Sequence, residues 1–420
     1  MRILFRFASK SFLIYPTNSN HIRPIHICRS FLTLLLLSGS QVFAQGNSSF
    51  KPEKVSPEDF NITSPLITPG TGAIVIADIG AAALERKDEG WTILFKRTKR
   101  LKILSQAGFE ACTISLQYSA DDNRNNKLKD LKAATYNLNA DKVEMTSLSS
   151  DDIFITREKK SDLIEEKFTF PAVKVGSIIE YSYSVRYSDI LDLYPWNFQG
   201  KYPTLWTEYA VTIPGVFNYT KIMQGLLPFY QTSVDSVKRN VWIGTGSINM
   251  DVYTLKWSMK DVPEIKTEPM VYCPDNYVSK IHFQIARSPV SGYGSRTRFR
   301  SWQYLANYLL EWPFGQAAEA GKSWLKDTVT VLTQNCSNDL DKAKKIFAYV
   351  RDNYQSIGTS VHPYTDPKKA FTSRKGTSAD LNLMLTAMLR TAGITADPVL
   401  LATRSSGKII QEYPVLENID

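Results

Sequence analysis

The polar residues that open one apolar helix are the part of the sequence best placed to do chemistry. Thr377, Ser378 and Asp380 come directly before or at the start of an apolar run at 381–389. Thr377 and Asp380 have the spacing of a capping box, in which each side chain accepts a hydrogen bond from the other residue's backbone. Ser378 is the candidate nucleophile. A serine hydroxyl reacts poorly near neutral pH unless a neighbouring base activates it.

Ser378 also has an explanation that needs no chemistry. Serine is common at the start of helices, because its hydroxyl accepts a hydrogen bond from an unpaired backbone N–H of the first turn. The residues by themselves leave both interpretations open.

The elements around these residues can be predicted from the local pattern. Gly376 indicates a turn before the helix. The run at 381–389 is apolar at nearly every position, which predicts a helix buried on most sides. Gly393 suits the left-handed residue that ends a helix, and residues 396–402 predict a strand.

This layout resembles the catalytic helix of the transglutaminase-like superfamily, in which a Gly-x-Cys-x-Asp segment opens a buried helix that ends in Leu-Leu-Arg-x-x-Gly-Ile. The matching residues are Gly376, Asp380, Leu389, Arg390, Gly393 and Ile394. A helix ending in Tyr-Val-Arg-x-Asn, matched at 349–353, precedes this segment in the family. The cysteine of the family aligns with Ser378. A cysteine benefits from a helix N-terminus because the dipole lowers the pKa of its thiol.

The resemblance implies that catalysis also needs a histidine and then an acid on strands after the nucleophile. Residues 379–420 contain no histidine, and the sequence ends about where those strands are expected. We therefore expect residues 340–420 to be an incomplete, non-catalytic transglutaminase-like domain, with helix 381–389 partly uncovered. His282 and His362 are the histidines outside the leader, and His362 does not occupy the family's position.

Residues 58–290 predict a β-sandwich, because strand-sized segments alternate with turn residues. Motifs at 131–137, 170–181, 196–199 and 208–214 resemble the uncharacterised β-rich module that precedes transglutaminase-like domains in exported proteins of Gram-negative bacteria. The fold class expected is thus a mainly β N-terminal sandwich followed by an α+β, papain-like partial domain. Residues 291–339 form the predicted helical connector.

Trp196, Phe198 and Trp206 suggest a platform for a glycan or peptide, although core aromatics are the alternative, because buried aromatic residues dominate sandwich cores. The basic residues of 92–104 alternate with apolar ones, and we expect them on one face of a strand, either solvated or as a binding stripe.

The first 44 residues predict a signal peptide, with a linker at 45–57. Arg29 precedes the apolar run 31–37, and Val42-Phe43-Ala44 fits a cleavage site. We expect an exported protein, periplasmic or secreted, with no membrane span. Removal of this leader lowers the formal charge from +9 to +4, which argues against nucleic acid as a partner. Cys112, Cys273 and Cys336 form no metal motif.

Three functions remain open. The first is a binding or scaffold protein of the cell envelope, whose partner would be a peptide, a glycan or an envelope protein, with no cofactor or metal. The second is a peptidase or acyl-transfer enzyme that uses Ser378 with residues beyond Asp420. The third is a purely structural product without a ligand.

Overall fold

The computed structural model describes residues 54–414 except 88–89, 120–127, 158–162, 189, 191, 244–245, 267, 272, 289–300, 312–313, 359–364 and 404–406. The chain divides into two compact units, 1–50 and 51–420, and all described residues belong to the second. The predicted signal peptide, most of the predicted linker and His362 lie outside the described residues.

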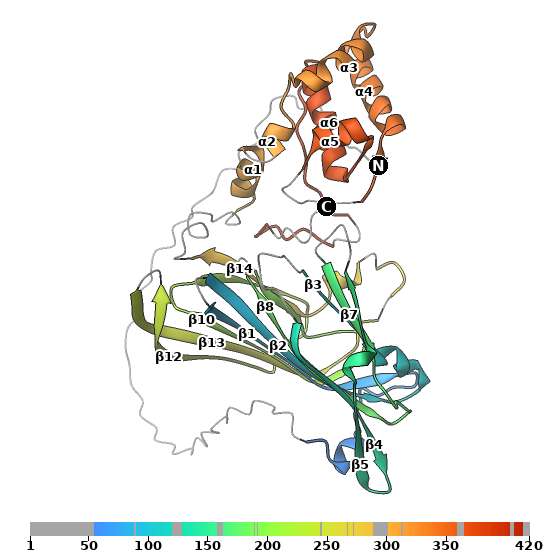
Figure 1. Cartoon of the computed structure of the whole chain (residues 1–420), viewed down its shortest axis with the longest axis vertical. Helices are drawn as coiled ribbons and strands as arrows, with labels where there is room; N and C mark the ends of the chain where they lie inside the picture. Colours follow the sequence, from blue (N-terminus) through green and yellow to red (C-terminus); the bar gives the residue numbers. More distant parts are fainter. Residues whose placement is uncertain are drawn as a thin grey trace, which may run out of the picture. The chain divides into compact units, whose positions relative to one another are not determined.

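An eight-stranded sheet organises the β-rich part of the chain, and Figure 1 shows its long strands side by side. The strand order is β12-β13-β10-β1-β2-β8-β4-β5. Neighbours pair antiparallel except β1 and β10, which are parallel. The strands are β1 (Ala73–Lys87), β2 (Gly90–Ile103), β4 (Leu128–Asn139), β5 (Lys142–Ser147), β8 (Ile178–Tyr187), β10 (Thr204–Pro214), β12 (Gln231–Ile243) and β13 (Gly246–Val262).

Two three-stranded sheets pack on the large sheet. One has the order β11-β14-β9, with β11 (Asn218–Gln224), β14 (Lys280–Arg287) and β9 (Asp192–Asn197). The other has the order β3-β7-β6, with β3 (Thr113–Ser119), β7 (Leu163–Thr169) and β6 (Ile153–Arg157). Side chains of all three sheets form one core: Trp196 stacks on Tyr209 at 5.1 Å, and Phe168 meets Tyr181 edge-on. Short 3₁₀ turns lie at Pro57–Phe60, Gln106–Cys112, Ser150–Asp152 and Pro274–Asn276.

Strand β2 shows why its residues face the core. Its buried positions have the period of two that places alternate side chains on one face. The apolar residues of that face are Ile93, Phe95, Leu101 and Ile103. Arg97 and Lys99 are an even number of positions away from these residues along the strand, and therefore lie on the same inner face. The prediction that the basic side chains share one strand face is wrong, since Arg100 is buried on the opposite face against Glu180 and near Asp59.

The inner charges are paired with a carboxylate on β1. Arg97 donates from Nε and Nη2 to the two oxygens of Asp78 at 2.8 and 2.7 Å, and Lys99 Nζ lies 3.0 Å from Oδ2. The Arg97 guanidinium also lies 5.0 Å from the Trp196 ring centroid. Gly80 permits this packing, because a Cβ there would lie 2.3 Å from a Trp196 ring carbon. Burial raises the pKa of Asp78, but Arg97 and Lys99 outweigh it and hold the pKa below its ordinary value.

Among the residues that the structure describes, six helices and a short two-stranded sheet follow the β-rich part. The helices are α1 (Trp302–Glu311), α2 (Phe314–Ala317), α3 (Ser323–Thr333), α4 (Asp339–Asn353), α5 (Pro367–Ser373) and α6 (Ser378–Thr391), and β15 (Gln355–Ser356) pairs parallel with β16 (Lys375–Gly376). A mainly β part followed by a helical part confirms the predicted fold class. No helix among the described residues is long and apolar enough to cross a membrane.

The strand predicted at 396–402 is wrong, because the described residues there form no strand. The residues of this segment make other contacts instead. The carbonyl of Ala396 accepts a hydrogen bond from Arg390 Nε at 2.7 Å, and Pro398 has no N–H to donate to a neighbouring strand.

Replacing the inner carboxylate tests the charge cluster. We expect Asp78→Asn to lower the free energy of unfolding by about 3 kcal/mol at pH 7, because it leaves Arg97 and Lys99 beside a neutral partner in the core. The folded-state pKa of Asp78 is lowered, so its contribution is present above about pH 4 and is lost as the pH falls through that lowered pKa. The difference between wild type and variant should therefore shrink in acid.

Urea denaturation at pH 7 and pH 3 measures both effects. Asp235→Asn is the matched control, because Asp235 is exposed on β12. Equal stability of Asp78→Asn and wild type at pH 7 would contradict the structural role assigned to the cluster.

Candidate functional site

The first turn of α6 carries the predicted site residues Ser378 and Asp380. Thr377 is the N-cap, and its hydroxyl oxygen accepts a hydrogen bond from the Asp380 backbone N–H at 3.2 Å. Asp380 Oδ2 accepts from the Thr377 backbone N–H at 3.0 Å, which completes the predicted capping box. Asp380 Oδ1 accepts from the backbone N–H of Asp366 at 2.7 Å. One carboxylate therefore joins the start of α6 to the start of α5.

A second set of backbone contacts fixes the approach to Ser378. Gly376 pairs with Ser356 in the parallel β15–β16 ladder, and the Ser378 N–H donates to the Gly358 carbonyl at 2.9 Å. Gly376 has no room for a side chain, since a Cβ would lie 2.7 Å from the Cβ of Ala370. The glycine that the sequence pattern placed two residues before the nucleophile position is thus required by close packing.

Arg374 holds this turn through three aromatic rings, a feature that the sequence analysis missed. Its guanidinium lies 4.7, 5.5 and 5.6 Å from the ring centroids of Tyr354, Phe371 and Tyr349. Its Nη1 also donates to the Tyr349 hydroxyl at 2.7 Å and to the Tyr354 hydroxyl. Arg374 itself adopts φ 59°, in the left-handed region. These contacts fasten the residue before β16 to the C-terminal end of α4.

Ser378 is half-buried at the first position of α6, and no hydrogen bond joins its hydroxyl to a described residue that could act as a base. His282 is the histidine within the described part of the chain, and it lies on β14 of the β-rich part. Burial, with Lys280 nearby, lowers the pKa of His282 to about 4. The described residues therefore supply a nucleophile position without an imidazole beside it.

Helix α6 is covered on nearly all sides, as the apolar run predicts. Leu381 and every residue from Leu383 to Leu389 are buried. Helices α2, α3, α4 and α5 contact it, and Leu383 joins a cluster with Leu305 and Phe314. The expectation that this helix is left partly uncovered is wrong, because the preceding helices fill that role. Gly393 ends the segment with φ 81°, as predicted.

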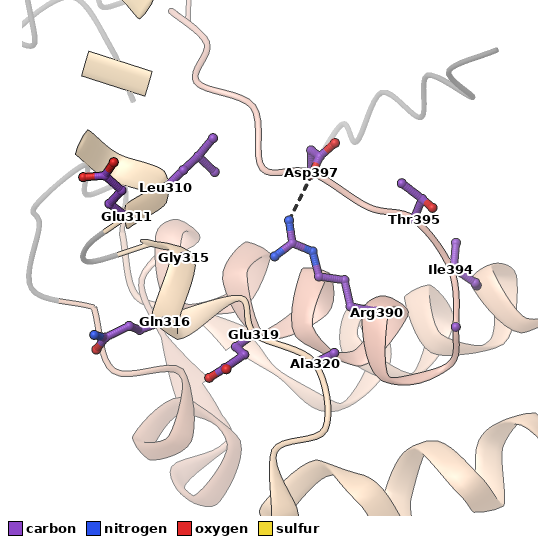
Figure 2. A pocket seen from close by; sticks show the side chains of 11 residues that line it. Leu310, Glu311, Gly315, Gln316, Glu319, Ala320, Arg390, Ile394, Thr395 and Asp397 are labelled. Atoms are coloured by element: carbon purple, nitrogen blue, oxygen red, sulfur yellow. Dashed lines mark hydrogen bonds and ion pairs between the residues drawn. The ribbon is translucent and has the colours of Figure 1, made fainter. Parts of the chain in front are cut away.

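An open pocket of about 720 Å³ lies at the C-terminal end of α6 (Figure 2). Arg390 is the basic residue of its lining, but it is already engaged. It donates to the Ala318 and Ala396 carbonyls and pairs with Asp397 at 3.0 Å, as the dashed line in Figure 2 marks. This pocket lies at the opposite end of the helix from Ser378, so the two do not form one site.

The structure favours core packing over a ligand platform for two of the three predicted binding aromatics. Trp196 and Phe198 are each 2% exposed, and the Trp196 indole donates to Thr207 Oγ1 at 3.1 Å. Trp206 is half-buried and meets Tyr230 edge-on, with ring centroids 5.8 Å apart. The three residues therefore do not form one exposed surface.

Within the described ranges, no three side chains of histidine, cysteine, aspartate or glutamate gather closely enough to hold a metal ion. Cys112 and Cys273 are buried as free thiols, and Cys336 is half-buried.

Comparisons with known proteins agree with the two-part organisation. No curated protein matches the sequence. The fold is similar to the crystal structure of a candidate protease from Parabacteroides distasonis, with a TM-score of 0.53 and 15% identity over 77% of this chain and 59% of that protein. Residues 93–266 match the domain of unknown function DUF3857, and residues 326–412 match the transglutaminase-like superfamily. The chain therefore carries a DUF3857 domain followed by a transglutaminase-like domain.

Proposed function

We propose that this chain is an exported protein of the cell envelope whose transglutaminase-like domain does not catalyse acyl transfer. It instead binds a peptide or a glycan, or acts as a scaffold for another envelope protein. The observation that carries the proposal is the serine at position 378, where the resemblance to the family places a cysteine.

The physical reason lies in how a hydroxyl and a thiol differ. A helix N-terminus can lower the pKa of a thiol enough to populate the thiolate, whereas a serine hydroxyl needs a base in hydrogen-bond reach. The hydroxyl of Ser378 has no such partner among the described residues. Meanwhile the capping box, the Gly376 contact and the Arg374 contacts preserve the shape of the turn. A domain that keeps its framework without an activated nucleophile is suited to binding.

The alternative is an acyl-transfer or peptidase enzyme that uses Ser378 with a base supplied from outside the described residues. It draws support from the half-exposed position of Ser378 at the first turn of α6. A measurement of substrate turnover distinguishes the non-catalytic binding protein from the Ser378 enzyme.

The decisive variants are Ser378→Ala and Ser378→Cys. We expect wild type, Ser378→Ala and Ser378→Cys to show the same background rate in two assays, because none of the described residues places an imidazole beside position 378. The assays are hydrolysis of a casein-derived peptide mixture and incorporation of a fluorescent amine into a glutamine-containing peptide.

Thermal melting provides the folding control, since a substitution of this size at a half-exposed position should change stability by less than about 1 kcal/mol. A wild-type rate that disappears in Ser378→Ala, with unchanged melting, would refute the non-catalytic reading and establish the alternative.

Export is supported by the basic and apolar segments of the first 44 residues. We expect the protein purified from its native cells to begin at Gln45 and to be recovered from the periplasmic or extracellular fraction. Intact-mass spectrometry of that material provides the test. A mass that still includes Met1, in protein recovered from the cytoplasm, would overturn the proposed location.

A further inference from the structure

A second cavity, of about 340 Å³, lies within the β-rich part of the chain. Strands β2 and β8 of the large sheet, strand β3 of a small sheet, and Tyr194 of β9 contribute to its lining. The volume falls in the range of small-molecule sites, which begins at roughly 300 Å³. It can therefore accept a ligand of the size of one amino acid or one sugar ring.

Tyrosines dominate the lining: Tyr118, Tyr181, Tyr183, Tyr187 and Tyr194. Burial raises the pKa of Tyr183 and of Tyr187 well above the ordinary value. Their hydroxyls are therefore neutral in the physiological range and can donate a hydrogen bond. The rings supply flat apolar walls for the rest of a ligand.

Arg97 is the charged side chain of this lining. Asp78 accepts from Nε and Nη2, and the guanidinium carries further N–H donors. Tyr183 is its neighbour across the β2–β8 pair and lines the same cavity. Asp78 is shared between Arg97 and Lys99, so the three groups carry one positive charge in excess. The Arg97 end of the cavity is therefore cationic.

Two acids outside the lining bond to residues of β3 that line the cavity: Glu165 accepts from the Ser115 hydroxyl at 2.5 Å, and Glu166 is the partner of Tyr118. The Tyr118 hydroxyl donates to Glu166 at 2.6 Å. Both contacts lie on β3, whereas Asp78 is the carboxylate that the described residues place against Arg97. A small ligand that carries an anionic group at one end and is otherwise neutral matches this distribution of charge along the cavity.

We propose that the cavity binds a small carboxylic acid, with the carboxylate beside Arg97 and the hydroxyl of Tyr183. Arginine suits this role because its planar guanidinium matches the geometry of a carboxylate. The inference extends the binding role proposed above by naming a site and a ligand class. It does not depend on Ser378, so the turnover assays and the binding test can fail separately.

Two matched pairs of probes test the ligand class on the purified chain by isothermal titration calorimetry. The first pair is N-acetyl-alanine and N-acetyl-alaninamide, and the second is glucuronate and glucose. We expect a carboxylate to bind at least about tenfold more tightly than its neutral partner, since a hydrogen bond to a charged group contributes about one order of magnitude in affinity.

The pattern identifies the source of the carboxylate. Binding of N-acetyl-alanine alone supports an amino acid or a peptide end, and binding of glucuronate alone supports an acidic sugar. The proposal is overturned if a neutral probe binds as tightly as its carboxylate partner. It is also overturned if no probe binds at concentrations on the order of 10 mM, above the physiological range of most metabolites.

One variant pair locates the site. Tyr183→Phe removes a lining hydroxyl and should weaken carboxylate binding by about tenfold. Tyr253→Phe removes a hydroxyl from β13 outside the lining and should leave the affinity unchanged. Thermal melting shows that each variant is folded. Unchanged affinity in folded Tyr183→Phe would place the carboxylate elsewhere and overturn the assignment.

Discussion

The carboxylate of Asp380 is the interaction on which the candidate site depends. It accepts hydrogen bonds from the backbone of Thr377 and of Asp366, so one side chain fixes both the first turn of α6 and the start of α5. Because backbone groups at a helix start have no partner within the helix, their capping decides where the helix begins. Ser378 is the first residue of α6 because the capping contacts make the helix begin there.

The contacts that shape the turn before α6 are independent of the side chain at position 378. Gly376 and Arg374 shape the turn through packing and cation–π contacts, and neither contact involves the hydroxyl of Ser378. A hydroxyl and a thiol at this position are therefore compatible with the same turn, although a helix dipole activates a thiol and not a hydroxyl. The fold of this turn is set by its framework residues and not by the candidate nucleophile.

The sequence predicted the features that depend on local pattern. The capping box, the buried α6 and the main strands follow from spacing and periodicity. The Arg374 contacts and the tyrosine-lined cavity join residues far apart in the chain, so no local pattern contains them. One signal was available: Arg97 and Lys99 share parity with the apolar residues of β2, which already indicates an inner face. The strand expected at 396–402 failed because strand pairing depends on a partner as well as on composition.

The most direct test of the central claim is the reactivity of Ser378 toward a fluorophosphonate, which modifies serines that a neighbouring base has activated. The account predicts that the intact mass of the purified protein does not change after incubation with the reagent. A stoichiometric mass increase that maps to Ser378, and that is absent from Ser378→Ala, would show an activated nucleophile and would contradict the account.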